Sequence, residues 1–169
     1  MDVNPELSEL FCTMMRANRP EVAQAILSEP DCDVHHRSSG GQTPLHIAAA
    51  SFMPGIVALL IAKGADPNAL DDRGRTPLMI AAKTGDDRAA EQLLKRGANP
   101  NLVTRQMRWT ALMWAARYRR IAVLKRLLAN GAEPEIRDKN GHTAADTARK
   151  HGATAALALL EPKTKQAPP

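Results

Sequence analysis

Apolar side chains in this chain come in short stretches with helical spacing, arranged in pairs and separated by polar segments. In residues 43–75, Leu45, Ala48 and Ala49 supply one apolar stripe, and a denser apolar stretch follows at 56–61. Residues 66–75 are then polar and rich in turn-forming residues. The pattern predicts two short helices followed by a β-turn or hairpin, which we call the finger.

The residues at the ends of these stretches support the same prediction. Thr43 is suited to cap the first helix, and Pro44 to occupy its first turn, where a missing N–H costs nothing. Gly64 follows the second apolar stretch, where a left-handed residue closes a helix.

The pattern returns along the chain at a nearly constant period. Thr-Pro-Leu-His begins at Thr43, and related tetrapeptides begin at Thr76, Thr110 and Thr143, at intervals of 33, 34 and 33 residues. A second phrase, Gly-Ala-Asp-Pro-Asn at 64–68, returns as Gly-Ala-Asn-Pro-Asn at 97–101 and Gly-Ala-Glu-Pro-Glu at 131–135. Two motifs that recur together at the same interval indicate a repeat architecture.

These two phrases resemble the ankyrin-repeat family, and the resemblance covers nearly the whole chain. It implies an all-α solenoid of stacked helix-turn-helix units with β-turn or hairpin fingers. We predict one ankyrin-repeat domain at 4–161, in units of about 4–40, 41–73, 74–107, 108–140 and 141–161. A short disordered C-terminal tail is predicted at 162–169, where Pro, Lys, Gln and Thr predominate.

The first and last units depart most from the pattern, as end caps with one solvent-facing side should. The last unit ends on an apolar stretch, in which we predict that Leu157, Leu159 and Leu160 are buried against the fourth unit.

Composition narrows the class of protein. The formal charge is +5, which is moderately basic, and aromatic residues make up only 3%. No apolar run reaches the length of a membrane span, and the N-terminus lacks the features of a signal peptide. We therefore expect a soluble cytoplasmic protein, without contact with a membrane and monomeric.

The sequence offers little support for catalysis or for a metal site. It contains none of the common hydrolase, phosphate-loop or zinc-protease motifs, so we expect no enzymatic activity and no cofactor. The resemblance assigns His46 a hydrogen bond to backbone between adjacent units. Cys32 lies near two histidines but lacks a fourth ligand partner, which favours an ordinary turn. The carboxylate pairs 71–72 and 86–87 are interpreted as solvated surface or helix N-terminal charge.

The fourth unit departs from the pattern of the others. Its finger has one extra residue, and Arg108 and Arg119 stand where other units have glycine. Three of the five aromatic residues of the chain, Trp109, Trp114 and Tyr118, lie in this unit. Residues 105–126 contain seven basic residues and no acidic ones, whereas the first forty residues contain seven acids and three bases.

Ankyrin arrays bind in the concave groove formed by fingers and first helices, so the resemblance marks groove positions here. We predict that Trp109 is exposed there, near Arg117 and Tyr118, and that Trp114 fills the core because it replaces an aliphatic residue. The predicted partner-binding residues are Arg73, Arg75, Lys83, Arg105, Met107, Arg108, Trp109, Arg117, Tyr118 and His142.

The sequence thus predicts a non-enzymatic module that binds another protein, whose contact groups are acidic or apolar. The alternative is a binder of an anionic polymer such as RNA or DNA, with aromatic rings stacked on bases and arginines along phosphates. The protein partner is favoured because the acidic first unit would repel a nucleic acid lying along the groove. A third possibility, an inhibitor or immunity protein of a specific enzyme, is not distinguished from an adaptor by any sequence feature.

Overall fold

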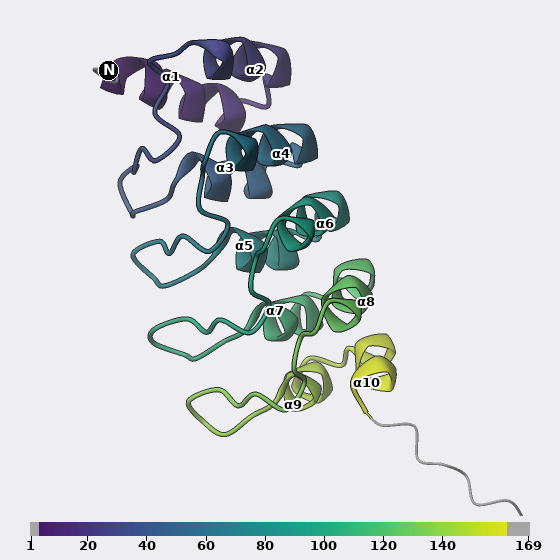
Figure 1. Cartoon of the computed structure of the whole chain (residues 1–169). Helices are drawn as coiled ribbons and strands as arrows, with labels where there is room; N and C mark the ends of the chain where they lie inside the picture. Colours follow the sequence, from purple (N-terminus) through teal and green to yellow (C-terminus); the bar gives the residue numbers. More distant parts are fainter. Residues whose placement is uncertain (1–3, 162–169) are drawn as a thin grey trace, which may run out of the picture.

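A computed structural model describes residues 4–161, in which ten helices are arranged as five successive pairs (Figure 1). The pairs stack in chain order, and the fingers project to one side of the stack. Residues 4–161 contain no strand, so the predicted all-α solenoid is confirmed. The predicted disordered tail at 162–169 lies outside the described residues.

Each pair consists of a first helix, which precedes a tight turn, and a second helix, which follows it. The first helices are α1 Pro5–Arg16, α3 Pro44–Ala50, α5 Pro77–Thr84, α7 Ala111–Arg117 and α9 Ala144–Lys150. The second helices are α2 Pro20–Ser28, α4 Pro54–Ala62, α6 Asp87–Lys95, α8 Ile121–Ala129 and α10 Thr154–Leu160.

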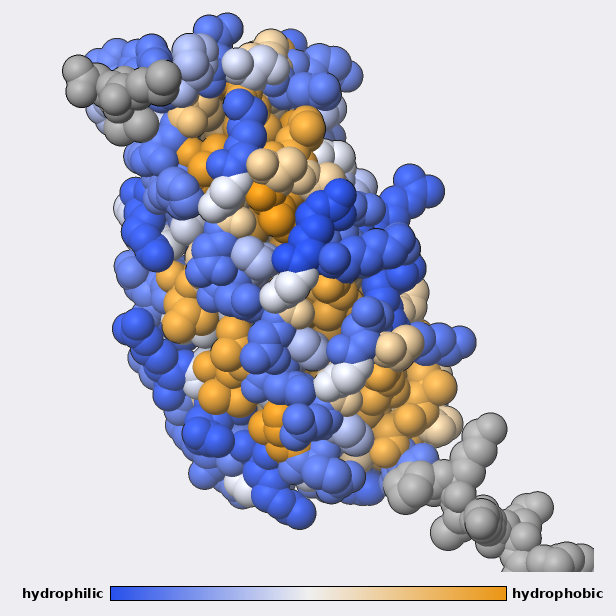
Figure 2. Space-filling model, viewed as in Figure 1, coloured by the Kyte–Doolittle hydropathy of each residue, from blue (hydrophilic) through white to orange (hydrophobic). Residues whose placement is uncertain are grey.

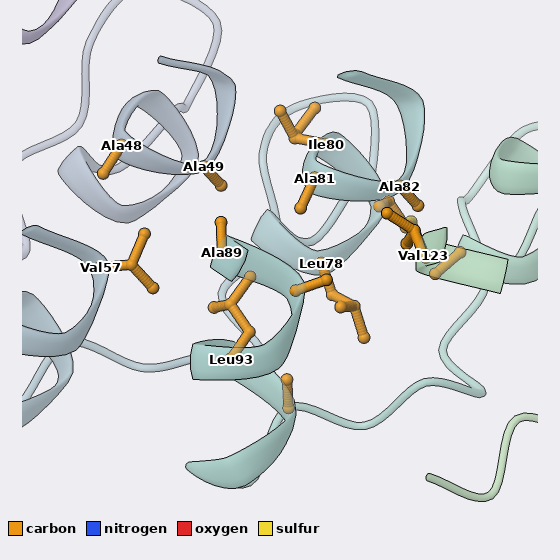
Figure 3. Close-up of a cluster of buried hydrophobic side chains, with 14 of the residues drawn as sticks. Ala48, Ala49, Val57, Leu78, Ile80, Ala81, Ala82, Ala89, Leu93 and Val123 are labelled. Carbon is orange, nitrogen blue, oxygen red and sulfur yellow. The ribbon is translucent and has the colours of Figure 1, made fainter. Parts of the chain in front are cut away.

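The core runs continuously between neighbouring pairs. First helices pack on first helices, as α5 does on α3 and α7, and second helices pack on second helices. Figure 3 shows how small many of the buried side chains are, with Ala48 near Val57 and Ala89 near Leu93. Because alanines let helices approach closely, a chain poor in aromatic residues still forms a close-packed core.

In the second to fifth units a threonine caps the first helix, and the residue three positions later differs between units. In the second unit, the Thr43 N–H donates to Nδ1 of His46 (3.2 Å), and Nε2 of His46 donates to the Arg75 carbonyl of the next unit (2.9 Å). The predicted backbone hydrogen bond of His46 is therefore confirmed. Met79 replaces it in the third unit, where its sulfur lies 3.5 Å from the Thr76 nitrogen.

The fingers are tight turns that bond to one another. In the finger at 71–75 the Asp71 N–H donates to the Arg75 carbonyl (3.0 Å), and the Asp72 N–H donates to the Gly40 carbonyl of the preceding finger (3.1 Å). The interpretation of Asp71 as solvated surface was wrong: its side chain is fully buried and accepts from the backbone N–H groups of Arg73 and Arg75. A carboxylate that closes a turn in this way is structural.

Short polar side chains link the units below the fingers. The Asn68 amide donates to the Gly97 carbonyl (3.0 Å), and its oxygen accepts from the Asn99 N–H (2.7 Å). Asn101 repeats both bonds one unit later, to Gly131 and Glu133. These asparagines are therefore structural, because they join the backbones of neighbouring units.

The last helix buries only part of its apolar stretch. Leu160 is buried and Leu157 is partly buried against the core, but Leu159 is 38% exposed, so its predicted burial was wrong. Ala156 and Leu160 lie four positions apart on one helix face, and Leu159 falls outside that face. On the side of the molecule in Figure 2, apolar patches are separated by hydrophilic side chains, so apolar area alone does not mark a binding site there.

Candidate functional site

The finger of the fourth unit absorbs its extra residue without disturbing the helix that follows. Thr104 takes the place of Asp71: its N–H donates to the Trp109 carbonyl (3.0 Å), and its hydroxyl accepts from the Trp109 N–H (3.0 Å). Arg108 has a φ of 55°, in the left-handed region that Gly41 and other finger glycines occupy. The backbone therefore places Trp109 at the base of the finger, next to the first turn of α7.

Trp109 is half-buried, whereas the sequence predicted it exposed, and its indole is held by a hydrogen bond to the next finger. Its Nε1 donates to Oδ2 of Asp138 in the next finger (3.3 Å). Burial by itself raises the pKa of Asp138, but the N–H groups of His142 and Asn140 and the Trp109 indole outweigh it, so that the pKa is lowered. Asp138 therefore stays ionised and holds the tryptophan in place.

Trp109, Trp114 and Tyr118 form one aromatic row. The Trp109 and Trp114 rings meet edge to face with centroids 4.9 Å apart, and Trp114 and Tyr118 stack with centroids 6.0 Å apart and an interplanar angle of 9°. The prediction that Trp114 fills the core was therefore wrong in part. It packs on the core but remains partly exposed in this row, because an indole is larger than the site that isoleucine fills at the equivalent Ile47 and Ile80.

Two cations lie against the aromatic row. The ammonium of Lys83 is 5.8 Å from the Trp114 ring centroid and 6.0 Å from that of Tyr118. The Arg117 guanidinium is 5.6 Å from the Trp109 centroid and 5.7 Å from that of Tyr118. Such contacts contribute roughly 0.5–1 kcal/mol each at exposed sites, and they hold both positive charges over the rings.

These residues line a hollow of about 310 Å³ between the fingers and the first helices. We call it the aromatic hollow; it is lined by the three rings of the row and by the cations Arg73, Arg75, Lys83 and Arg117. Thr104, Gln106 and Met107 complete it, and none of the lining residues is acidic. Arg75 is paired with Asp71 (2.7 Å), but within residues 4–161 no carboxylate lies within 4 Å of the charged groups of the other three cations.

A second hollow adjoins the first on the side of α9, and we call it the histidine hollow. Its lining includes His142, His151, Lys150 and Arg149, with the carboxylates of Asp138 and Asp146. Met107, Trp109 and Arg117 line both hollows. The two hollows are therefore neighbouring parts of one groove.

Arg117 also connects the hollows through a hydrogen bond. Its Nη1 donates to Nε2 of His151 (2.9 Å). Desolvation, together with the nearby charges of Arg117, Lys150 and Arg119, lowers the pKa of His151. His151 is therefore neutral at pH 7 and accepts this bond without cancelling the charge of Arg117.

The structure brings most of the residues predicted from the sequence together. Arg73, Arg75, Lys83, Met107, Trp109, Arg117 and Tyr118 line the aromatic hollow, and His142 lines the histidine hollow. Arg105 and Arg108 are exposed on the finger and line neither hollow. Sequence reasoning missed Trp114 as a groove residue; its spacing of four from Tyr118, which puts both on one face of α7, was the available signal.

Residues 4–161 do not meet the requirements of a metal site or of a helix that spans a membrane. No three His, Cys, Asp or Glu side chains in this range gather as a metal site would require. None of the described helices is long and apolar enough to cross a membrane.

Comparison with known proteins gives a consistent result for the whole array. A family model described as ankyrin repeats in three copies matches residues 10–104, and a second, described as ankyrin repeats in many copies, matches residues 105–148.

Among curated proteins, a mitochondrial disaggregase of Bos taurus is 34% identical over 153 residues, which are 89% of this chain and 22% of that protein. Protein phosphatase 1 regulatory subunit 27 of Homo sapiens is 43% identical over 47 residues, 28% of this chain and 30% of that protein. The BTB/POZ domain and ankyrin repeat-containing protein NPR5 of Oryza sativa subsp. japonica is 45% identical over 49 residues, 28% of this chain and 10% of that protein. The chain thus spans less than a third of each of these relatives.

Proposed function

Because the chain belongs to the ankyrin-repeat family, whose arrays are typically non-enzymatic protein-interaction modules, we propose that it binds a segment of another protein in the aromatic hollow. The segment is acidic and presents an apolar side chain to the rings. One observation carries the proposal: an aromatic row lies among cations, in a hollow without a lining carboxylate.

The charges of the aromatic hollow favour a negatively charged partner segment. Lys83 and Arg117 lie over the ring faces that a cationic ligand would need. Their charges, with that of Arg73, have no carboxylate within 4 Å in the described part of the chain, so a ligand carboxylate gains charge-assisted hydrogen bonds there. A positively charged segment is repelled.

The same contacts favour a protein over a nucleic acid. Base stacking needs an open ring face, but one face of Tyr118 is stacked on Trp114, and Arg117 lies over both Tyr118 and Trp109. The acidic first unit also opposes a polyanion that follows the groove along the array. An apolar side chain can instead fill the hollow beside the ring edges, where burial of aromatic area is favourable.

The test is a comparative affinity capture from the native lysate. The parent protein is compared with a groove variant, Lys83→Glu with Arg117→Glu, and with a matched control, Lys125→Glu, which reverses an exposed charge on the second helix α8. We expect one or more proteins to bind the parent and the control but not the groove variant, with no effect of nuclease treatment.

Two results contradict the proposal. Partners that bind the groove variant as well as the parent place the interface elsewhere. A nucleic acid that is captured, and whose binding falls steeply and log-linearly with salt, supports the polyanion alternative instead.

A further inference from the structure

We infer that the groove recognises an extended segment at two points one repeat apart, with an apolar anchor in the aromatic hollow and a carboxylate three residues away in the histidine hollow. The inference rests on the proposed function and makes it more specific, since it states the spacing of the partner's contact groups. Binding at two linked points explains why the hollows adjoin rather than lie at opposite ends of the array.

The first observation is that the hollows share a wall. Trp109 and Arg117 line both, and the hydrogen bond from Arg117 to His151 crosses from one to the other. A ligand in the aromatic hollow therefore lies beside the histidine hollow, and a chain leaving the anchor towards α9 enters it directly.

The second observation is that the carboxylates of the histidine hollow already have partners. Asp138 accepts from the N–H groups of Asn140 and His142 and from Trp109, and its side chain is only 4% exposed. Asp146 accepts from the N–H and hydroxyl of Thr143 and from Arg149. Oδ2 of Asp138 also lies 3.7 Å from Nδ1 of His142, but neither carboxylate lies within 4 Å of the Lys150 ammonium in the described part of the chain.

The remaining donors of the histidine hollow are His142 and Lys150. The His142 side chain is 51% exposed, and Lys150 is exposed at the end of α9. Arg149, in contrast, is bound to both Asp146 and Glu161. With Arg117 at the shared wall, Lys150 supplies a positive charge and His142 a ring N–H for a partner's carboxylate, one repeat beyond the rings.

The spacing follows from the repeat itself. The first helices α7 and α9 pack directly on each other, and packed helices lie about 8–10 Å apart. A polyproline II segment rises about 3.1 Å per residue with three residues per turn, so residues i and i+3 lie on the same side about 9 Å apart. In a β-strand, by contrast, residues three apart point to opposite sides. The separation of the two helices thus agrees with the i to i+3 distance in polyproline II. It favours a partner segment with an apolar residue and a carboxylate three positions apart, in either chain direction.

The chain supplies its own reporter for a test. Its two tryptophans both lie in the aromatic hollow, so their fluorescence reports on occupancy. The probes are synthetic peptides on a neutral, proline-rich scaffold with one leucine and one glutamate, separated by two, three or four positions in both directions. We expect one of the two peptides with a separation of three to bind about fivefold more tightly than those with two or four, the effect of one exposed ion pair.

Two variants decide what causes the preference. His142→Ala with Lys150→Ala should abolish the advantage of the three-residue spacing while leucine binding remains, and Lys125→Ala should change nothing. Equal affinity at all spacings, or no binding of any peptide, overturns the inference. Neither result touches the proposed function, which is tested separately by whether capture depends on Lys83 and Arg117 and by whether a nucleic acid is captured instead.

Discussion

The second and fourth units have the same backbone and different surfaces. Gly41 and Arg108 occupy equivalent finger positions with φ of 70° and 55°, and Phe52 and Arg119 both have φ of 57° between the helices. Thr43 and Thr110 cap the equivalent helices α3 and α7. The extra residue in the fourth finger is absorbed by the turn, so the frame that presents the groove is the same in both units.

Three aromatic side chains distinguish the groove of the fourth unit from that of the second. Gln42, Ile47 and Ser51 of the second unit are replaced by Trp109, Trp114 and Tyr118 in the fourth. Ile47 is buried and contributes to the core, whereas Trp114 extends into the groove. The comparison teaches that the repeat fixes where a groove position lies, and that large side chains at a few such positions determine whether an aromatic hollow forms there.

The largest expected effect tests whether the cores of the second and fourth units contribute equally to stability. Leu45 and Leu112 are equivalent and almost fully buried, with 0% and 1% of their surface exposed. Leu45→Ala and Leu112→Ala should each lower the free energy of unfolding by roughly 2–5 kcal/mol, through lost burial and a residual cavity. Chemical denaturation of both variants is the measurement. A cost confined to one unit would show that the frames differ despite their shared backbone.

The next effect distinguishes the groove surface of the fourth unit from that of the second in partner binding. Trp109→Ala should weaken binding of the captured partner by about 2 kcal/mol, the range of interface hot spots, while Gln42→Ala leaves it unchanged. Isothermal titration and melting curves on both variants are the measurements. Trp109→Phe is the matched control, because it keeps an aromatic ring but removes the N–H that Asp138 accepts. Unchanged partner affinity for Trp109→Ala would exclude the aromatic hollow as the main contact.

The sequence was sufficient for the repeat and the helix caps, because each depends on local residue types at fixed spacing. Thr-Pro at the helix starts and the recurring glycines determine the backbone, and the structure agrees with both. The sequence was insufficient to predict how deeply individual side chains are buried. Aligning Trp114 with Ile47 gave its position but not the fact that an indole exceeds the space available there.

Two further errors have the same origin. Leu159 lies in an apolar stretch, but the stretch exceeds what one helix face can bury. Asp71 looks like surface charge in the sequence, and only the closed turn shows that backbone N–H groups surround it. Which cations remain unpaired in the groove also depends on the geometry of the finger turns, as in the pair Arg75–Asp71.

A smaller effect is expected where the two fingers differ in backbone chemistry. A Cβ on Gly41 would lie 2.9 Å from the backbone nitrogen of Asp72, in addition to the cost of a left-handed conformation. Gly41→Ala should therefore destabilise the protein by roughly 1–3 kcal/mol. Arg108→Gly should instead stabilise it slightly, by up to about 1 kcal/mol, because glycine adopts the left-handed conformation without strain. Thermal unfolding of both variants is the check, and a destabilised Arg108→Gly would show that Arg108 contributes contacts of its own.

The smallest effect at neutral pH concerns the cap residue. His46 is fully buried in the second unit, where Met113 stands in the fourth. His46→Met should cost about 1 kcal/mol at pH 7, because the Thr43 N–H and the Arg75 carbonyl lose their partner while the volume is retained.

The two proteins should then differ in their response to acid. Desolvation lowers the pKa of His46 in the folded state, whereas in the unfolded chain the imidazole titrates near its ordinary value of about 6.5. The unfolded state therefore binds the proton more readily, so the contribution of a neutral His46 is complete above pH 6.5 and is lost as the pH falls from there towards the lowered folded pKa. The parent should lose more stability between pH 7 and pH 5 than His46→Met, and the deficit of the variant should shrink on acidification. Denaturation midpoints at several pH values measure this, and parallel profiles for the two proteins would mean that His46 is not what makes the second unit sensitive to acid.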